Sequence, residues 1–381
     1  MKKFQLTKYV NPSFLAIVGL LLLYGTIMVN SATSGSGLKR QLFGIAVGAV
    51  LLGFFWWFDY RKMKDWIVPL FILDALLMLS PRIPGLGYNA KGATSWLALG
   101  GKIRLFQPSE PAKLVTIILL ASIMVAYKGK IGSLKDYLKI LGLSFIPVIL
   151  ILTQPDLGTG LVFIAIALGM LIMAGAKARW IIATVVIGLS LGIGMVWIDG
   201  IADTKVGHDV LLKDYQKNRL LVFVDQNLDP TGAGYNLKQS KIAIGSGQTT
   251  GKGLGAGTQG NLNFLPERHT DFIFSVVGEE LGFAGAMALL ALYLALLMVS
   301  LNIAVSSVDL FGTLLVTGVM SMWVFQILEN IGMTIGLMPI TGIPLPFMSY
   351  GSSFMVTNMA CVGVLLSVWS HRAFQSTAKG M

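Results

Sequence analysis

The segment FLPERHTDF (264–272) places four ionisable side chains directly before an apolar run: Glu267, Arg268, His269 and Asp271. A carboxylate is costly to hold at a membrane surface, so its retention indicates a function. Partial desolvation raises the pKa of such a carboxylate and neighbouring cations lower it, which tunes the group to remove a proton from a hydroxyl. Position alone favours a simpler role for Asp271, the N-cap of the helix that begins after it.

Cationic side chains near this segment fit a substrate that carries phosphate. Arg268 belongs to the segment itself, and Lys241 and Lys252 precede it in a long polar stretch. The Gly-rich sequence GQTTGKGLGAGTQGN (247–261) is not a nucleotide-binding loop, because the Walker pattern needs a glycine where Ser246 stands. Its glycines can still bring backbone amides close to an anion, or they can form a flexible lid.

Glu110 and Lys113 lie three residues apart in QPSEPAKL (107–114), a spacing that pairs two side chains on one face of a helix. Pro108 and Pro111 suit the first turn of that helix, where missing amide donors cost little. Pairing also reduces the cost of burying both charges. The pair is either a structural staple or the charged floor of a cavity that opens outward.

Three other carboxylates stand in or beside apolar runs. Asp74 and Glu329 fall inside predicted membrane spans, where a carboxylate is either functional or a hydrogen-bonded core group. Asp156 stands in the turn TQPDLGTG (153–160), where its position favours a helix cap. The sequence holds only three histidines and no HExxH motif, so we expect no metal site built from protein ligands.

The composition is that of a membrane protein. Hydrophobic residues make up 55% of the 381, charged residues only 12%, and the mean hydropathy is +0.74, whereas a soluble domain carries about 25% charge. The net charge of +11 does not indicate a nucleic-acid partner, because the Lys and Arg residues are scattered over loops, as expected beside an anionic membrane surface. We therefore predict an all-α, polytopic integral membrane protein that forms one domain over residues 1–381.

Ten apolar runs are long enough to be membrane helices of about 20 residues once errors at their boundaries are allowed. The first follows Met1-Lys2-Lys3 and looks like a signal peptide, but it is long and many spans follow, so we expect it to be retained. The third and fifth runs are short, and we expect them to extend into the flanking loops. The predicted spans are 14–31, 41–58, 66–80, 109–127, 138–153, 159–175, 180–199, 273–301, 312–335 and 354–370.

An even number of spans places both termini on one side of the membrane, which we predict to be the cytoplasm. Lys and Arg concentrate in the loops on that side, whereas the short outer loops hold only Lys39 and Arg40. Two long outer segments, 81–113 and 200–272, carry the polar residues of interest. The larger one separates spans seven and eight, and its residues 236–246 predict a short amphipathic helix on the membrane surface.

Four segments, spread over nearly the whole chain, resemble the SEDS family (shape, elongation, division, sporulation) of bacterial cell-wall polymerases. They are KGATSWLALGGKIRLFQPSEPAKL (91–114), TQPDLGTG (153–160), YNLKQSKIAIGSGQTTGKGLGAGTQGNLNFLPERHTDFIFSVVGEELG (235–282) and GLMPITGIPLPFMSYGSS (336–353). The third is highly specific and is more like the elongation (RodA) branch than the division branch. The fourth has Gly351-Ser352 where the family usually has Gly-Gly. The ten-span plan with a large outer loop matches as well.

The resemblance implies a peptidoglycan glycosyltransferase that polymerises lipid II, a disaccharide-peptide on undecaprenyl pyrophosphate, for cell elongation and rod shape. The 4-hydroxyl of the acceptor sugar attacks the anomeric carbon of the donor, and the linkage inverts from α to β. The essential aspartate of the family corresponds to Asp271, the expected general base, and Glu110 and Lys113 match a charge pair lining the cavity. Other matching positions, of less defined role, are Trp96, Arg104, Gln239, Ser240, Lys241, Glu267 and Arg268.

The resemblance also implies the partners and the location. A class B penicillin-binding protein (a transpeptidase) and further membrane proteins of the elongation complex are the expected partners, in the bacterial cytoplasmic membrane. The leaving pyrophosphate favours a divalent cation, Mg²⁺ or Mn²⁺, as the one cofactor to expect. The rival functions are a lipid II flippase and a non-catalytic scaffold that activates the transpeptidase. An outer carboxylate and the lack of an inverted repeat argue against the first, and the cations around Asp271 argue against the second.

Overall fold

The computed structural model describes residues 10–83, 86–90, 93–99, 103–152, 154, 156–206, 214–262 and 264–378. Long apolar helices dominate it, as the composition requires. In chain order the elements are α1 (Pro12–Ala32), α2 (Leu38–Trp57), η2 (Tyr60–Trp66), α3 (Ile67–Leu79), η3 (Ser80–Arg82), β1 (Gly87–Ala90), β2 (Ala93–Leu99), β3 (Ile103–Phe106), α4 (Ser109–Met124), η4 (Val125–Tyr127), α5 (Leu134–Leu152), α6 (Leu157–Met173), α7 (Ala178–Val206), α8 (Asp214–Val224), α9 (Ala233–Ser246), α10 (Thr258–Asn261), α11 (Ile273–Val305), α12 (Leu310–Ile335) and α13 (Ser352–Ala378).

Each of the ten predicted spans is occupied by a helix. Seven of these helices within the described residues are long and apolar enough to cross a membrane, namely α1, α2, α4 with η4, α7, α11, α12 and α13. The helices α3 and α6 are shorter, and α5 carries three charged residues near its beginning. The third predicted span reaches into its flanking segments only as the 3₁₀ turns η2 and η3, whereas α5 begins at Leu134, before the start of the fifth predicted span. That all ten helices cross the membrane, and that both termini are cytoplasmic, stay predictions.

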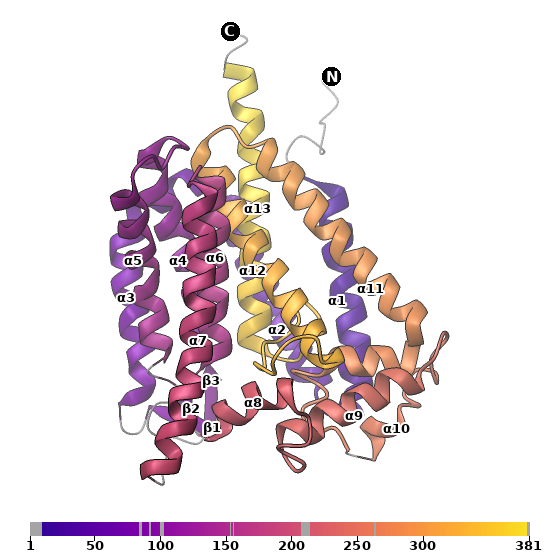
Figure 1. Ribbon diagram of the computed structural model, residues 1–381. Coiled ribbons are helices and arrows are strands. Elements are labelled where there is room, and N and C mark those ends of the chain that lie inside the picture. The colour runs from indigo at the N-terminus through magenta and orange to yellow at the C-terminus, as the bar shows by residue number, and fades with distance from the viewer. Residues whose placement is uncertain are drawn as a thin grey trace, which may run out of the picture.

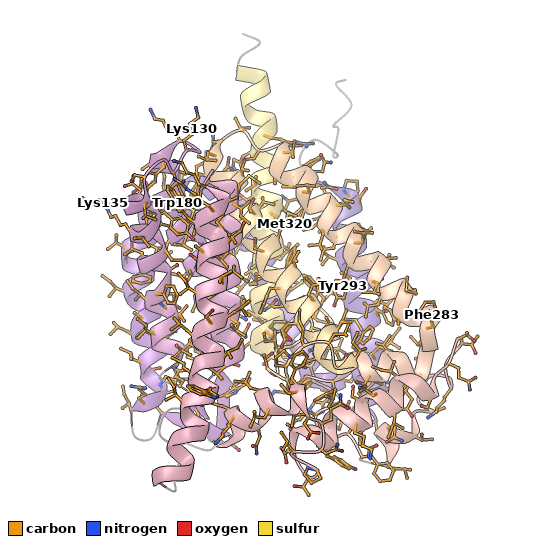
Figure 2. The ribbon with its side chains drawn as sticks, viewed as in Figure 1. Lys130, Lys135, Trp180, Phe283, Tyr293 and Met320 are labelled. Carbon is orange, nitrogen blue, oxygen red and sulfur yellow. The ribbon has the colours of Figure 1, made fainter. Side chains whose placement is uncertain are left out.

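The two ends of the bundle differ in content. The start of α1 and the end of α13 lie at one end, and α8, α9, α10 and the three strands gather at the other (Figure 1). Lys130 and Lys135 lie at the end that holds the termini (Figure 2). This arrangement agrees with an even number of spans and with the side predicted to be rich in positive charge.

A small antiparallel sheet, ordered β1-β2-β3, precedes α4. Trp96 of β2 pairs with Tyr88 of β1, and Ala98 of β2 pairs with Arg104 of β3. No strand was expected in this outer segment. The sheet is the only departure from an all-α fold among the described residues.

The centre of the bundle is formed by α12 and α13. Trp323 of α12 is fully buried, and its Nε1 donates to Asn358 Oδ1 of α13 at 2.7 Å. This hydrogen bond satisfies the indole N–H inside an apolar core, as buried tryptophan requires. The connection from α12 to α13 contains Phe347, which is also fully buried and packs against Trp323 with ring centroids 5.5 Å apart. The loop after α12 is therefore part of the core, which gives it the rigidity that an active site needs.

Helix α11 is interrupted at Gly282, where φ is 64° and ψ is −161°. The amides of Phe283 and Ala284, which begin the second part, donate to the carbonyls of Gln248 and Thr249 at 2.8 and 3.0 Å. Backbone of the Gly-rich loop thus satisfies donors that a helix start leaves unpaired. The break connects the polar loop rigidly to the membrane helix.

Candidate active site

Asp271 is half-buried and stands immediately before the N-cap of α11. The N-cap itself is Phe272, and no side chain makes a capping hydrogen bond there. The simple capping role for Asp271 is therefore wrong.

The backbone of Asp271 is fixed by α12. Asn330 Nδ2 donates to the carbonyl of Asp271 at 2.8 Å and to the carbonyl of Ile343 at 2.8 Å. One residue earlier, the carbonyl of Thr270 accepts from Ser349 Oγ at 2.7 Å. Asn330 and Ser349 are fully buried, so these bonds form in a medium where each is strong. The carboxylate of Asp271 is consequently carried on a rigid turn.

An arginine lies beside this carboxylate. Arg219 of α8 donates from Nη1 to the carbonyl of Thr341 at 3.0 Å. A β-carbon placed on the next residue, Gly342, would stand 3.1 Å from Asp271 Oδ2 and 3.2 Å from Arg219 Nη1. The carboxylate and the guanidinium therefore both lie against Gly342. The φ of +79° at this position is a second reason why a glycine stands there. The site therefore holds an acidic and a cationic side chain close together at one position of the loop.

Glu329 extends the cluster into the bundle. It is buried on α12 and accepts from Thr341 Oγ1 at 2.5 Å, and the charges of Asp271 and Arg219 both act on it. The sequence left Glu329 open between a functional and a core role, and the structure places it at the candidate site. Asp74, the other intramembrane carboxylate, is buried on α3.

The Glu110–Lys113 pair forms as the spacing predicted. Lys113 Nζ lies 2.9 Å from Glu110 Oε1, both residues are buried, and Lys113 Nζ also lies 5.4 Å from the centroid of the Phe354 ring. The amide of Gln107 donates to Ser353 Oγ at 3.2 Å, so the start of α4 is attached to the start of α13.

An apolar groove of about 770 Å³ lies next to this pair, between α2, η2, α3, α4 and α13. Pro111 and Leu114, which flank the lysine in sequence, line it together with Ser353 of α13. Aromatic side chains line much of the rest: Phe43, Phe54, Phe55, Phe58, Trp66 and Phe106. The lining is almost wholly apolar, which suits a hydrocarbon chain better than a polar ligand.

The Gly-rich loop is neither a phosphate cradle nor a flexible lid. Glu279 Oε1 accepts from Lys252 Nζ at 2.6 Å and from the amides of Thr258 and Gln259 at 2.7 and 3.0 Å. Glu280, also buried, accepts from Ser31 Oγ at 2.6 Å and from the amide of Gly255 at 3.1 Å. These amides and Lys252 already bind carboxylates of the protein. The loop is therefore ordered without an anionic substrate.

Glu267 and Arg268 shape the turn that carries Asp271. The backbone carbonyl of Glu267 accepts from the amide of Phe272 at 3.2 Å. The side chain of Glu267 accepts through Oε2 from Thr270 Oγ1 at 3.2 Å. Arg268 donates from Nε to the carbonyl of Ala32 at 2.6 Å and from Nη1 to the carbonyl of Gly260. Desolvation lowers the pKa of Arg268, although the charge of Glu280 opposes that shift.

The remaining predicted residues have varied surroundings. Ser240 is fully buried and bonds to Ser275 Oγ at 2.6 Å and to the carbonyl of Thr334 at 2.7 Å, so it joins three helices and does not face a substrate. Lys241 is exposed, with Nζ 3.4 Å from Gln226 Oε1, and Gln239 is half-buried on the same helix. Trp96 is half-buried, and the side chain of Arg104 lies outside the described residues.

Two predicted secondary features are confirmed. Asp156 caps α6, since its Oδ1 accepts from the amide of Thr159 at 3.0 Å. The helix predicted over residues 236–246 forms as α9, and its position on the membrane surface stays a prediction.

Sequence reasoning missed Arg219, Asn330 and the anchoring carboxylates Glu279 and Glu280. Arg219 belongs to a stretch of alternating basic and apolar residues, but nothing distinguished it from the neighbouring Lys217. In the described part of the chain no three His, Cys, Asp or Glu side chains gather as a metal cage. The set Asp271, Glu329 and Arg219 includes a cation of its own, so these residues do not fit a protein-bound Mg²⁺ or Mn²⁺.

Comparison with known proteins places this site in a family. A family model for cell cycle proteins that covers FtsW, RodA and SpoVE matches residues 8–373, so the chain belongs to this family of polytopic membrane proteins. Peptidoglycan glycosyltransferase MrdB of Escherichia coli K12 is 38% identical over 371 residues, which cover 97% of this chain and 95% of the relative. Stage V sporulation protein E of Bacillus subtilis is 35% identical, with 95% and 98% covered.

Solved structures agree with the assignment. One chain of a peptidoglycan synthase complex, studied for its coordination of polymerization and crosslinking, superimposes with a TM-score of 0.78 at 30% identity, covering 94% of this chain and 97% of that one. The rod shape determining protein RodA of Thermus thermophilus superimposes with a TM-score of 0.68 at 27% identity, covering 94% and 96%. The SEDS resemblance is thereby confirmed.

Proposed function

We infer that this protein is a peptidoglycan glycosyltransferase, the activity by which its relatives MrdB and FtsW are named. The observation that carries a catalytic role is the half-buried carboxylate of Asp271, held on a turn fixed by Asn330 and accompanied by Arg219. A rigid carboxylate beside a cation, at the polar end of a membrane bundle, suits proton removal from a sugar hydroxyl.

We propose lipid II as the substrate and Asp271 as the general base. Asp271 accepts the proton of the acceptor 4-hydroxyl as the oxygen bonds to the anomeric carbon of the donor. The bond from that carbon to the pyrophosphate oxygen breaks on the opposite face, so the α linkage becomes β. Arg219 supplies positive charge near the carboxylate, at the same glycine of the loop. None of these steps uses a metal ion. A divalent cation would arrive bound to the pyrophosphate of the substrate.

The lipid tail is proposed to occupy the apolar groove between α2, α4 and α13. The Glu110–Lys113 pair lies beside this groove and has no net charge, so a hydrocarbon chain can pass it at little cost. Burial of an isoprenoid chain that leaves water contributes about 25 cal/mol per Å² of buried surface. Here the chain enters the groove from lipid and not from water, so the main effect of the groove is to orient the chain.

The partners follow from the same function. The solved synthase complex combines polymerization with crosslinking, and we propose that this chain likewise acts with a class B penicillin-binding protein. A place in the elongation complex of the bacterial cytoplasmic membrane is proposed on the relation to RodA.

The test compares wild type with Asp271→Asn, each purified with its transpeptidase, on fluorescent lipid II, with glycan strands resolved on a gel. Polymer from wild type alone supports the assignment. Polymer from both proteins would remove Asp271 from the mechanism. No polymer from either intact complex would favour the flippase or scaffold function.

A further inference from the structure

A second cavity, polar and about 330 Å³ in volume, lies against the segment that leads to Asp271. The α1–α2 turn contributes Thr33 and Ser36, the 264–272 segment contributes Arg268 and His269, and the 336–351 loop contributes Tyr350. Asp271, Arg219 and Gly342 do not line it. The two sites share one wall, because the amide of Tyr350 donates to the carbonyl of His269 at 2.9 Å, two residues before Asp271.

The polar atoms of this cavity select the type of ligand. Thr33 Oγ1 donates to the carbonyl of Val29 at 2.7 Å, and Ser36 Oγ donates to the carbonyl of Thr33 at 2.8 Å. A hydroxyl has one proton to donate and two lone pairs to accept with. Both protons are already used within the turn, so these oxygens can serve a ligand only as acceptors. Thr33 Oγ1 also accepts from the amide of Gly37 at 3.0 Å, which leaves it one lone pair for a ligand.

Arg268 donates from Nε to the carbonyl of Ala32 and from Nη1 to the carbonyl of Gly260, which uses two of the five N–H groups of its guanidinium. The cavity thus places a cationic donor beside hydroxyl oxygens that accept. A sugar hydroxyl can donate to the oxygens of Thr33 and Ser36 and accept from a guanidinium, whereas an ionised phosphate only accepts and would meet the lone pairs of both oxygens. The cavity therefore favours a carbohydrate over the pyrophosphate of the substrate.

Two rings complete the surface. His269 and Tyr350 are half-buried, with centroids 5.4 Å apart and planes inclined at 64°. Amphipathic rings of this kind offer an apolar face and a polar tip, which match the two kinds of surface on a pyranose. The backbone bond between the same two residues keeps the rings in place.

We propose that this cavity binds a sugar unit of the growing glycan strand. The inference rests on the proposed function, since a polymerase must hold the strand between additions as well as the incoming unit. A strand held only at Asp271 would dissociate sooner, because strand length depends on how slowly the product leaves compared with the next addition. The cavity is thus a site for processivity and not for bond formation.

The test fills the cavity without altering Asp271. Ser36→Trp, or the smaller Ser36→Leu, places bulk at an exposed turn position that lines the cavity, and Lys39→Trp adds the same bulk to an exposed position of the following helix that does not line it. The proteins polymerise fluorescent lipid II with the transpeptidase present. We expect strands severalfold shorter from the Ser36 variants, with an unchanged initial rate, and normal strands from Lys39→Trp.

Wild-type strand lengths from a folded Ser36→Trp would overturn the inference while leaving the proposed function intact, and so would a parallel loss of initial rate and length. Absence of polymer from wild type would instead refute the proposed function. Saturation-transfer NMR measures ligand binding independently of polymerisation. The probes are a β-1,4-linked N-acetylglucosamine tetrasaccharide and inorganic pyrophosphate. We expect Ser36→Trp to weaken binding of the tetrasaccharide severalfold, and selective loss of pyrophosphate binding would make the cavity an anion site and contradict the proposal.

Discussion

Asn330 and Asp271 are joined by a hydrogen bond of 2.8 Å from the Asn330 side-chain amide to the Asp271 carbonyl, although they lie 59 residues apart in the chain. The same amide nitrogen reaches Ile343, so it ties the catalytic turn and the loop after α12 to one buried point. The carboxylate of Asp271 and the loop that approaches it therefore cannot move independently.

Asn330→Ala should lower both stability and activity. Loss of two buried hydrogen bonds leaves two carbonyls without this donor, at a cost of about 1–3 kcal/mol each. Asn358→Ala is the matched control, because Asn358 is also a buried amide with two hydrogen bonds, to Trp323 and to the carbonyl of Phe354. We expect both variants to melt earlier and only Asn330→Ala to lose polymerisation per folded molecule. Equal activity of the two would exclude a positioning role.

Asp271→Asn should fold normally and lose polymerisation by about 10²-fold or more, the usual contribution of a general base. The amide has the size of the carboxylate but cannot take up the proton. Asp225→Asn is the control, since Asp225 is an exposed carboxylate that follows α8. Gel analysis of glycan strands and a thermal melt measure the two effects, and a melt that drops sharply for Asp271→Asn would mean that the loss reflects folding.

Local signals in the sequence predicted the scaffold well. Apolar length located the ten helices, the three-residue spacing predicted the Glu110–Lys113 ion pair, and the position of Asp156 predicted its cap. Each of these features depends on residues close in the chain. The small sheet was missed, because its outer segment lacks the alternation that marks a strand.

The site was only partly predictable for the same reason. Arg219 meets Thr341 across 122 residues, and no local pattern reports such a contact. Glu279 and Glu280 fall inside the predicted span 273–301, and only the fold shows that they anchor the Gly-rich loop. Ser240 shows the opposite error, since it matches a family motif and yet serves only to join helices.

Glu279→Gln should loosen the Gly-rich loop. Glu279 is buried and accepts from Lys252 and from two loop amides, and hydrogen bonds to a charged group contribute about 1.5–3 kcal/mol each. Hydrogen exchange of residues 252–259 should accelerate, with slower polymerisation because the same loop supports the break in α11. Asp136→Asn makes the same chemical change near the start of α5 and should leave this loop protected. Unchanged exchange in Glu279→Gln would show that the neutral amide suffices as an anchor.

Gly342→Ala should abolish most polymerisation. The methyl group would stand 3.1 Å from Asp271 Oδ2 and 3.2 Å from Arg219 Nη1, closer than ordinary contact, in a position whose φ of +79° already disfavours alanine. Gly255→Ala separates strain from crowding, because Gly255 has a φ of +73° but open space around its β-carbon position. Both variants should lose about 1 kcal/mol of stability from the backbone alone, as a thermal melt would show. Only Gly342→Ala should displace the acid from the guanidinium and lose activity beyond its loss of folded protein. Full activity in a folded Gly342→Ala would mean that the close placement of Asp271 and Arg219 at Gly342 is not required for the transfer.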